Sequence, residues 1–323
     1  MYKIKNKICQ TKNKFNMQIQ SLSIVVPGGC PNNCPCCVSK LHTDLDSYKN
    51  QLEDNYQFEA LYSADFKDAL EFARDNGCNA MMFTGDGEPL MNRNFMRKVA
   101  ELNRQLKNPF LWNEIQTTGV FLLDKGNNGG EKNLRWLRDY MRIKMISLSV
   151  FNPFDSDENA KCTRPKNAKA YVDVEATCAA IRKYNFGLRL SLNLYDYYDG
   201  IAPVTIFKRA KELGANQITF RVLYNIDNPQ TSAEKEINDW IIKNKCTEET
   251  VWLINSYIRD NGRPLERLPF GAIRYSVHGM SCVVDDDCMS SKTEEIKDQV
   301  KYLILRPDCK LYTRWDDEGS MLF

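Results

Sequence analysis

The sequence lacks several features that would define a protein class at once. No stretch approaches the roughly 18 uninterrupted apolar residues that a membrane-spanning helix requires, so we expect no membrane partner. The lysine-rich start does not lead into an apolar signal segment. The chain also has no large excess of charge of one sign, because its 44 Lys and Arg and 42 Asp and Glu give a formal net charge of +2. This balance gives no overall electrostatic argument for nucleic-acid binding.

The composition that is present is that of an ordinary globular chain. At 323 residues with 43% hydrophobic content, it can form one large α/β domain or a main domain with an appendage. Twelve cysteines are many, and most of them are scattered along the chain. Thiols that serve as metal ligands need reducing surroundings, so we expect the cytoplasm.

The tightest group of cysteines lies in the segment Cys-Pro-Asn-Asn-Cys-Pro-Cys-Cys, after an apolar run at 22–26. Cys30, Cys34 and Cys37 form a CxxxCxxC spacing on a loop that two prolines and two glycines interrupt. Thiolates suit zinc or iron–sulfur clusters, and a cluster normally takes four ligands. Three cysteines therefore indicate a cluster with one open iron. A zinc site that recruits Cys36 or His42, or a set of uncommitted buried thiols, remains an alternative.

A second motif follows the apolar run at 79–83. Its residues are Thr84, Gly85, Asp86, Gly87, Glu88 and Pro89. The glycines allow the backbone to approach a ligand closely, and the proline ends the strand. Such a loop can present main-chain carbonyls to an ammonium group.

Together, CxxxCxxC after one strand and Gly-Asp-Gly-Glu-Pro after the next resemble the radical S-adenosylmethionine (SAM) superfamily. The resemblance implies that Cys30, Cys34 and Cys37 hold a [4Fe-4S] cluster and that its open iron chelates SAM. It implies that the loop 84–89 binds the SAM amino group and that an external donor such as flavodoxin or ferredoxin supplies an electron. SAM is then cleaved to methionine and a 5′-deoxyadenosyl radical, which takes a hydrogen from the substrate. Family members often carry an aromatic residue where this chain has Cys36, which leaves the third ligand ambiguous, although the spacing favours Cys37.

Further cofactor-binding residues are suggested by the same resemblance, each near the end of an expected strand or in the loop that follows it. They are Thr117 in a Thr-Thr-Gly sequence, Ser149, Arg164, Asn193 and Arg221. Arg164 can pair bidentately with a carboxylate, and Arg221 can meet SAM or an anionic substrate. Each could instead be an ordinary loop cap or a solvated charge.

The hydrophobic pattern predicts alternating strands and helices, and hence a parallel sheet. Strands are expected at 22–27, 79–84, 113–118, 144–150, 187–194 and 216–223, and helices near 64–76, 94–107, 132–142, 169–185 and 203–213. These units form a partial (β/α)6 barrel over residues 21–230, after a basic tail at 1–20. We interpret the segment 39–62 as a helix or a flap over the site. The segment 152–168 is interpreted as a long loop.

Beyond residue 230 we expect a small α+β extension over 231–323. Its expected elements are helices within 232–262 with a start at Thr247, strands at 270–278, 281–284, 299–306 and 310–315, and a hairpin that turns at Pro-Asp-Cys. We expect this extension to close or line the barrel and to influence substrate choice.

Substrate identity stays open at this stage. Arg164, Arg221, Arg274 and Arg306 suit an anionic substrate. The resemblance is slightly closer to cofactor- and nucleotide-modifying members of the superfamily than to peptide-modifying ones, which implies a nucleotide-like small molecule. Cys282, Cys288 and Cys309 raise the alternative of a peptide-modifying enzyme with an auxiliary cluster, although buried structural thiols fit their irregular spacing better. A third reading, from another class, is a zinc-binding module whose basic tail contacts RNA.

Overall fold

The computed structural model describes residues 18–37, 39, 64–85, 87–123, 129–225, 229, 231–268, 272–286, 299–315 and 318–322. The basic tail up to residue 17, nearly all of 39–62, Asp86 and Cys288 are outside these ranges, and so are the predictions made for them. No helix in the described ranges is both long enough and apolar enough to cross a membrane.

The described strands form one 11-stranded sheet in the order β11-β10-β1-β2-β3-β4-β5-β6-β9-β8-β7. Strands β10, β1 to β6 and β9 run parallel, and β11, β8 and β7 add antiparallel pairs at the two ends. The bounds are β1 Gln18–Val25, β2 Ala80–Thr84, β3 Trp112–Thr117, β4 Ile143–Val150, β5 Gly187–Leu194, β6 Gln217–Val222, β7 Gly262–Arg267, β8 Ile273–Val277, β9 Met280–Asp285, β10 Gln299–Leu305 and β11 Leu311–Tyr312.

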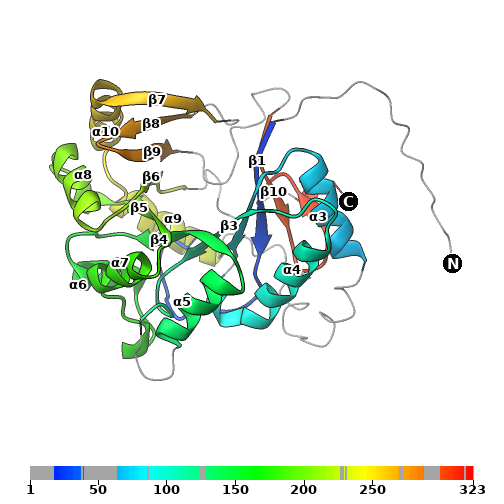
Figure 1. The fold of residues 1–323 in the computed structure, drawn as a ribbon. Helices are drawn as coiled ribbons and strands as arrows, with labels where there is room; N and C mark the ends of the chain where they lie inside the picture. The colour runs from blue at the N-terminus through cyan, green and yellow to red at the C-terminus, as the bar shows by residue number, and fades with distance from the viewer. Residues whose placement is uncertain are drawn as a thin grey trace.

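Helices cover the outside of the curved sheet, as Figure 1 shows. They are α3 Asp65–Asp75, α4 Arg93–Gln105, α5 Gly130–Asp139, α6 Ser156–Thr163, α7 Val174–Lys183, α8 Pro203–Glu212, α9 Ser232–Asn244 and α10 Glu248–Asn261, with short 3-10 turns that include η2 Pro89–Asn92. Strands that are followed by helices and pair in parallel confirm the expected α/β fold with a partial barrel.

Strand β5 explains why the barrel has an apolar outside and a polar inside. Leu188, Leu190, Leu192 and Leu194 alternate along it and belong to the main hydrophobic core together with residues of the covering helices. The intervening Arg189, Ser191 and Asn193 make polar contacts with neighbouring strands. Since side chains alternate between the two faces of a strand, these polar residues line the interior.

The C-terminal segment adds strands at both ends of the sheet. Strand β9 pairs with β6, whereas β10 pairs with β1, at the opposite edge of the first six strands. The expected hairpin is confirmed as β10 and β11, and the expected start of α10 is confirmed by Thr247, whose hydroxyl accepts from the Thr250 amide. The division at residue 230 stays a prediction.

Two elements were not expected. Helix α6 lies inside the segment 152–168 that we interpreted as a loop, and β7 follows directly after α10 as an edge strand. Helix α7 also begins at Val174, later than the predicted 169. These differences matter because α6 supports the site described next.

Candidate functional site

The predicted cluster cysteines lie on the loop after β1, at the carboxyl end of the parallel strands. Cys30, Cys34 and Cys37 are partly exposed and free of disulfides, whereas Cys36 is 8% exposed and belongs to the hydrophobic core. Burial raises the pKa of the Cys36 thiol well above its ordinary value. Because a ligand has to be a thiolate that the metal can reach, this placement favours Cys37 over Cys36.

Opposing effects act on the pKa of the Cys30 thiol. Burial raises its pKa, while the main-chain N–H of Asn32 donates to the sulfur and lowers it, and the charge of Glu88 raises it again. The Cys34 thiol donates to the Thr163 carbonyl at 3.4 Å, and the Cys37 sulfur lies 2.8 Å from the Ser39 hydroxyl. The three sulfurs are thus held by different parts of the chain.

The glycine-rich loop after β2 packs directly on the cysteine loop. The Glu88 amide donates to the Gly29 carbonyl at 3.0 Å. A Cβ on Gly87 would lie 2.3 Å from that oxygen, and a Cβ on Gly85 would lie 2.4 Å from the Val26 carbonyl. In the structure both glycines permit the close approach of the two segments. That they also admit a ligand stays a prediction.

The Glu88 side chain connects β2 to the end of β3. It is 2% exposed, and its carboxylate accepts from the Thr117 hydroxyl at 2.7 Å, the Thr118 amide at 2.8 Å and the Thr118 hydroxyl at 2.6 Å. Burial raises the pKa of Glu88, although these hydrogen bonds act to lower it. The carboxylate is therefore part of the framework of the site.

Helix α6 braces the cysteine loop from the opposite side. The Asn33 amide donates to the Thr163 and Arg164 carbonyls, and the Lys166 amide donates to the Pro31 carbonyl at 2.9 Å. Arg164 caps α6 in a left-handed conformation with φ 49° and has an exposed side chain. Sequence reasoning missed this support because only a few residues of α6 are buried.

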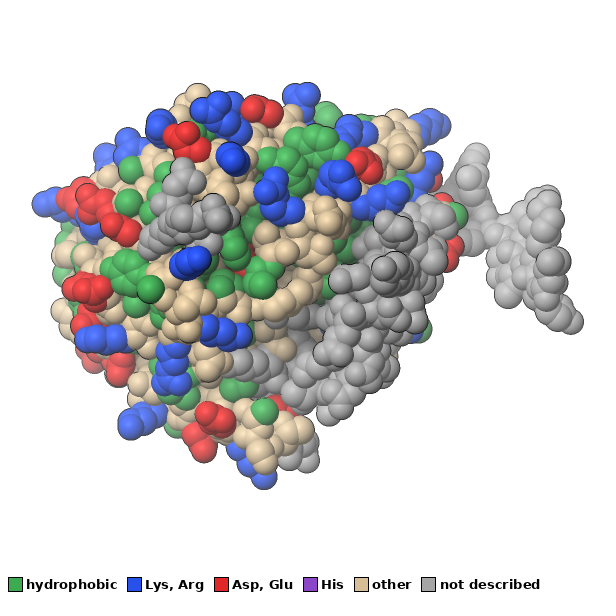
Figure 2. All heavy atoms as spheres, turned by 90° about the horizontal axis from the view of Figure 1, so that it is seen from below, with side chains coloured by type: hydrophobic (Ala, Val, Ile, Leu, Met, Phe, Trp, Pro, Cys, Tyr) green, Lys and Arg blue, Asp and Glu red, His purple; other side chains and the backbone are tan. Residues whose placement is uncertain are grey.

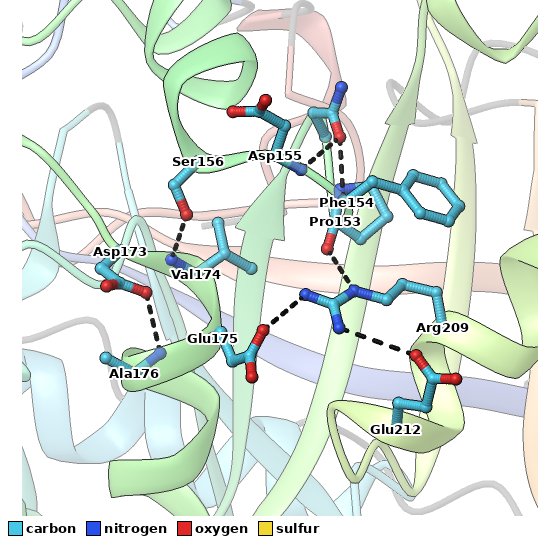
Figure 3. A network of polar contacts seen from close by, with 11 residues as sticks. Pro153, Phe154, Asp155, Ser156, Asp173, Val174, Glu175, Ala176, Arg209 and Glu212 are labelled. Atoms are coloured by element: carbon cyan, nitrogen blue, oxygen red, sulfur yellow. Dashed lines mark hydrogen bonds and ion pairs between the residues drawn. The ribbon is translucent and has the colours of Figure 1, made fainter.

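The segment that leads from β4 to α6 is fixed by side chains of three elements (Figure 3). Arg209 of α8 donates to the Pro153 carbonyl at 2.9 Å and pairs with Glu175 of α7 at 2.9 Å. The Ser156 hydroxyl accepts from the Val174 amide at 3.0 Å. These contacts hold α6 against α7 and α8, and through α6 they hold the cysteine loop.

Two other predicted residues lie next to each other on neighbouring strands. The Asn193 amide on β5 donates to the Ser149 hydroxyl on β4 at 3.2 Å. Their position near the carboxyl ends of the strands is the side on which ligands bind in parallel α/β folds. The structure thus brings Ser149 and Asn193 together on the same edge as the two motif loops.

Arg221 belongs to a charged group that the sequence did not reveal as a unit. Its Nε donates to Ser191 at 2.7 Å, and its guanidinium lies 3.4 Å from Asp285 on β9. Asp285 also pairs at 2.7 Å with Lys301 of β10, which is 2% exposed. Burial alone would lower the pKa of Lys301, but the neighbouring Tyr302 and Asp285 raise it above its ordinary value. The sequence signal for this group was a lysine in β10, a strand whose other residues after Gln299 are hydrophobic or aromatic.

The donor set fits a cluster better than a single metal ion. In the part of the chain that is described, no three His, Cys, Asp or Glu side chains gather around one point as a metal ion requires. A cubane makes no such demand, because each cysteine binds a different iron. Three partly exposed thiols on a short loop, none of them in a disulfide, therefore suit it.

The C-terminal cysteines are placed differently. Cys246, Cys282 and Cys309 are buried in the hydrophobic core, and burial raises the pKa of Cys282 and of Cys309 to about 12. Of the other arginines considered, Arg274 pairs with Glu266 on the β7–β8 hairpin, and Arg306 donates to the Trp315 carbonyl. These residues serve the extension itself.

Comparison with known proteins gives the family of the chain and the fold that it shares with solved structures. A sequence model of the Radical SAM superfamily matches residues 24–200. The structure of native anSMEcpe with bound AdoMet is 16% identical in sequence and superposes with a TM-score of 0.51. The match covers 94% of this chain and 77% of the anSMEcpe chain. SuiB from Streptococcus suis is 12% identical and has a TM-score of 0.50, and the match covers 92% of this chain and 60% of the SuiB chain. Native anSMEcpe with AdoMet and Cp18Cys peptide is 19% identical with TM-score 0.42, and this chain spans only 50% of it. No curated protein sequence matches. At these identities the solved structures establish the fold alone.

Proposed function

The chain belongs to the radical SAM superfamily, and from that premise we propose that Cys30, Cys34 and Cys37 hold a [4Fe-4S] cluster whose open iron binds SAM. When bound, the reduced cluster supplies the electron that cleaves SAM to methionine and a 5′-deoxyadenosyl radical, which takes a hydrogen from the substrate. The observation that carries the proposal is the direct packing of the glycine loop on the cysteine loop. The chain supplies the placement of both ligands.

SAM is proposed to lie along the carboxyl ends of β1 to β6. The loop Thr84, Gly85, Asp86, Gly87, Glu88 and Pro89 offers main-chain oxygens to the SAM ammonium group. Ser149 and Asn193, which contact each other, orient the rest of the molecule. Thr117 supports the site through Glu88, and Arg164 is the candidate partner of the SAM carboxylate.

We propose an anionic small molecule as substrate, with a nucleotide-like compound as one such class. Arg221 points into the barrel interior beside Asn193, which it faces in the parallel register of β5 and β6. Its Nε and Nη1 are engaged, and its Nη2 has no partner among the described residues. A partly exposed guanidinium held by Ser191 and Asp285 is preorganised for a carboxylate or phosphate.

A peptide substrate with an auxiliary cluster is the second candidate, since anSMEcpe has been solved with a peptide. The burial of Cys246, Cys282 and Cys309 in the apolar core favours the small molecule. A nucleic-acid partner has less support, because Lys and Arg are interspersed with Asp and Glu on the face in Figure 2. An external one-electron donor such as flavodoxin or ferredoxin and a cytoplasmic location complete the proposal.

Iron counting and a comparison of substrate binding by wild type and an Arg221 variant test this function. Anaerobically reconstituted protein should carry about four irons per chain, as expected of one cubane. A count near eight would support the auxiliary-cluster alternative, and a colourless zinc protein would contradict the proposal. Arg221→Lys should weaken the binding of an anionic substrate and leave iron content unchanged.

A further inference from the structure

Asn32 is the least satisfied polar side chain in the cysteine loop. It is 4% exposed, yet neither its Oδ1 nor its Nδ2 has a hydrogen-bond partner among the described residues. Burying an amide whose donor and acceptor have no partners is unfavourable, because each group loses its hydrogen bonds to water. Such a group in a native protein calls for a physical explanation, and a redox role is one of the recognised ones.

The backbone on both sides of Asn32 makes structural contacts. Asn32 forms a β-bridge with Pro165, in which the Asn33 amide donates to the Arg164 carbonyl and the Lys166 amide donates to the Pro31 carbonyl. The loop is therefore fixed on both sides of this residue without help from its side chain. The carboxamide contributes nothing to loop anchoring that the structure shows.

The position of Asn32 limits what the side chain can serve. It lies between Cys30 and Cys34, two of the proposed ligands, and its burial keeps it from water. A carboxamide offers two N–H donors, and cluster sulfides and thiolates accept hydrogen bonds in dry surroundings. We propose that Asn32 Nδ2 donates a hydrogen bond to a sulfur of the cluster and thereby raises its reduction potential. This inference rests on the cluster site of the proposed function.

The direction of the effect follows from charge. Reduction adds an electron to the cluster, and a hydrogen-bond donor stabilises the more negative state more strongly. Loss of the donor disfavours the reduced form. Asn32 is thus a tuning residue that makes the cluster easier to reduce.

A pair of neighbouring substitutions tests the proposal. Asn32→Leu removes the donor and keeps the side-chain size, and Asn33→Leu is the matched control because the Asn33 side chain is exposed. The measurement is an anaerobic redox titration of the cluster. At a fixed potential, we expect the ratio of reduced to oxidised cluster to be about tenfold lower in Asn32→Leu than in wild type. For a one-electron couple this corresponds to a midpoint potential about 59 mV more negative. Asn33→Leu should titrate like wild type. Equal midpoints for Asn32→Leu and wild type would overturn the inference.

A measurement on unsubstituted protein covers the case in which Asn32→Leu loads no cluster. Protein labelled with 15N only at asparagine side chains is reduced and examined by pulsed electron paramagnetic resonance. The hydrogen bond predicts a hyperfine coupling to one amide nitrogen, and absence of any coupling contradicts it. If wild-type protein binds no iron at all, the proposed function itself fails, which separates the two outcomes.

Discussion

Glu88 shows how a single buried carboxylate positions the site. Its oxygens accept three hydrogen bonds from Thr117 and Thr118, which end β3, while its own amide binds the cysteine loop. One residue thus links the first three parallel strands at the edge where the motifs lie. Hydrogen bonds to a charged acceptor are stronger than those between neutral groups.

Replacing Thr117 should therefore be costly. Thr117→Val keeps the shape but removes the donor to Glu88 and the acceptor of the Gly119 amide, and we expect a loss of about 1–3 kcal/mol in unfolding free energy. Thr177→Val is the matched control, because the buried Thr177 hydroxyl has no hydrogen-bond partner in the described part of the chain, so its removal should leave stability unchanged or higher. Denaturant unfolding compares the two. Equal losses would show that the bond to Glu88 adds nothing.

Sequence reasoning identified Glu88 and Thr117 but not their connection. Both belong to motifs, so their presence near the site could be predicted. Their hydrogen bond depends on the register between β2 and β3, which is set by long-range pairing. Asn32 was likewise part of a recognised motif, but only the folded chain shows that its side chain has no hydrogen-bond partner among the residues described.

At the scale of elements, the site depends on two loops in main-chain contact. A Cβ at Gly87 would meet the Gly28 and Gly29 carbonyls at 2.5 and 2.3 Å, and both are backbone atoms that cannot move aside cheaply. A Cβ at Gly29 meets nothing within 4 Å. The two glycines lie next to each other, but only Gly87 has to lack a side chain for the two loops to approach this closely.

Gly87→Ala should thus separate the loops, and Gly29→Ala should not. We expect Gly87→Ala to lower both the thermal midpoint and the iron retained per chain after reconstitution, with Gly29→Ala close to wild type. Differential scanning fluorimetry and iron analysis make the comparison. Retention of full iron by Gly87→Ala would contradict the role given to the loop contact.

The elements that the sequence failed to predict share a physical cause. Helix α6 buries only Asn159, Cys162 and Thr163, so it has no apolar periodicity to detect. Strand β7 is an exposed edge strand that follows a helix directly, and its residues lack the alternation of a half-buried strand. By contrast, the buried strands β4 and β5 matched their predicted ranges closely because continuous or alternating apolar residues mark them.

At the scale of the whole molecule, an ion pair joins the two ends of the parallel sheet. Lys301 on β10 contacts Asp285 on β9, although these strands lie at opposite ends of the parallel series. The partial barrel could be predicted from its βα units, whereas this closure could not, since no local pattern encodes pairing between residues so far apart in the sheet. The contact also holds Asp285 beside Arg221.

Lys301→Met should therefore destabilise the barrel. Removing Lys301 takes away the closer of two cations and leaves the buried Asp285 carboxylate with Arg221 at 3.4 Å, and we expect a loss of about 3 kcal/mol in unfolding free energy. Lys310→Met is the control, because Lys310 lies on the same hairpin with a half-exposed side chain. A loss no larger than that of the control would contradict the closing role of the pair.

The most direct test of the central claim is SAM cleavage by reconstituted protein. Anaerobic enzyme with dithionite and SAM is analysed for 5′-deoxyadenosine by chromatography. We predict formation of 5′-deoxyadenosine by wild type and by Cys36→Ala, and none when Cys30, Cys34 or Cys37 is changed to alanine. Wild-type protein that carries iron but releases no 5′-deoxyadenosine, or equal release by the Cys37→Ala variant, would contradict the account.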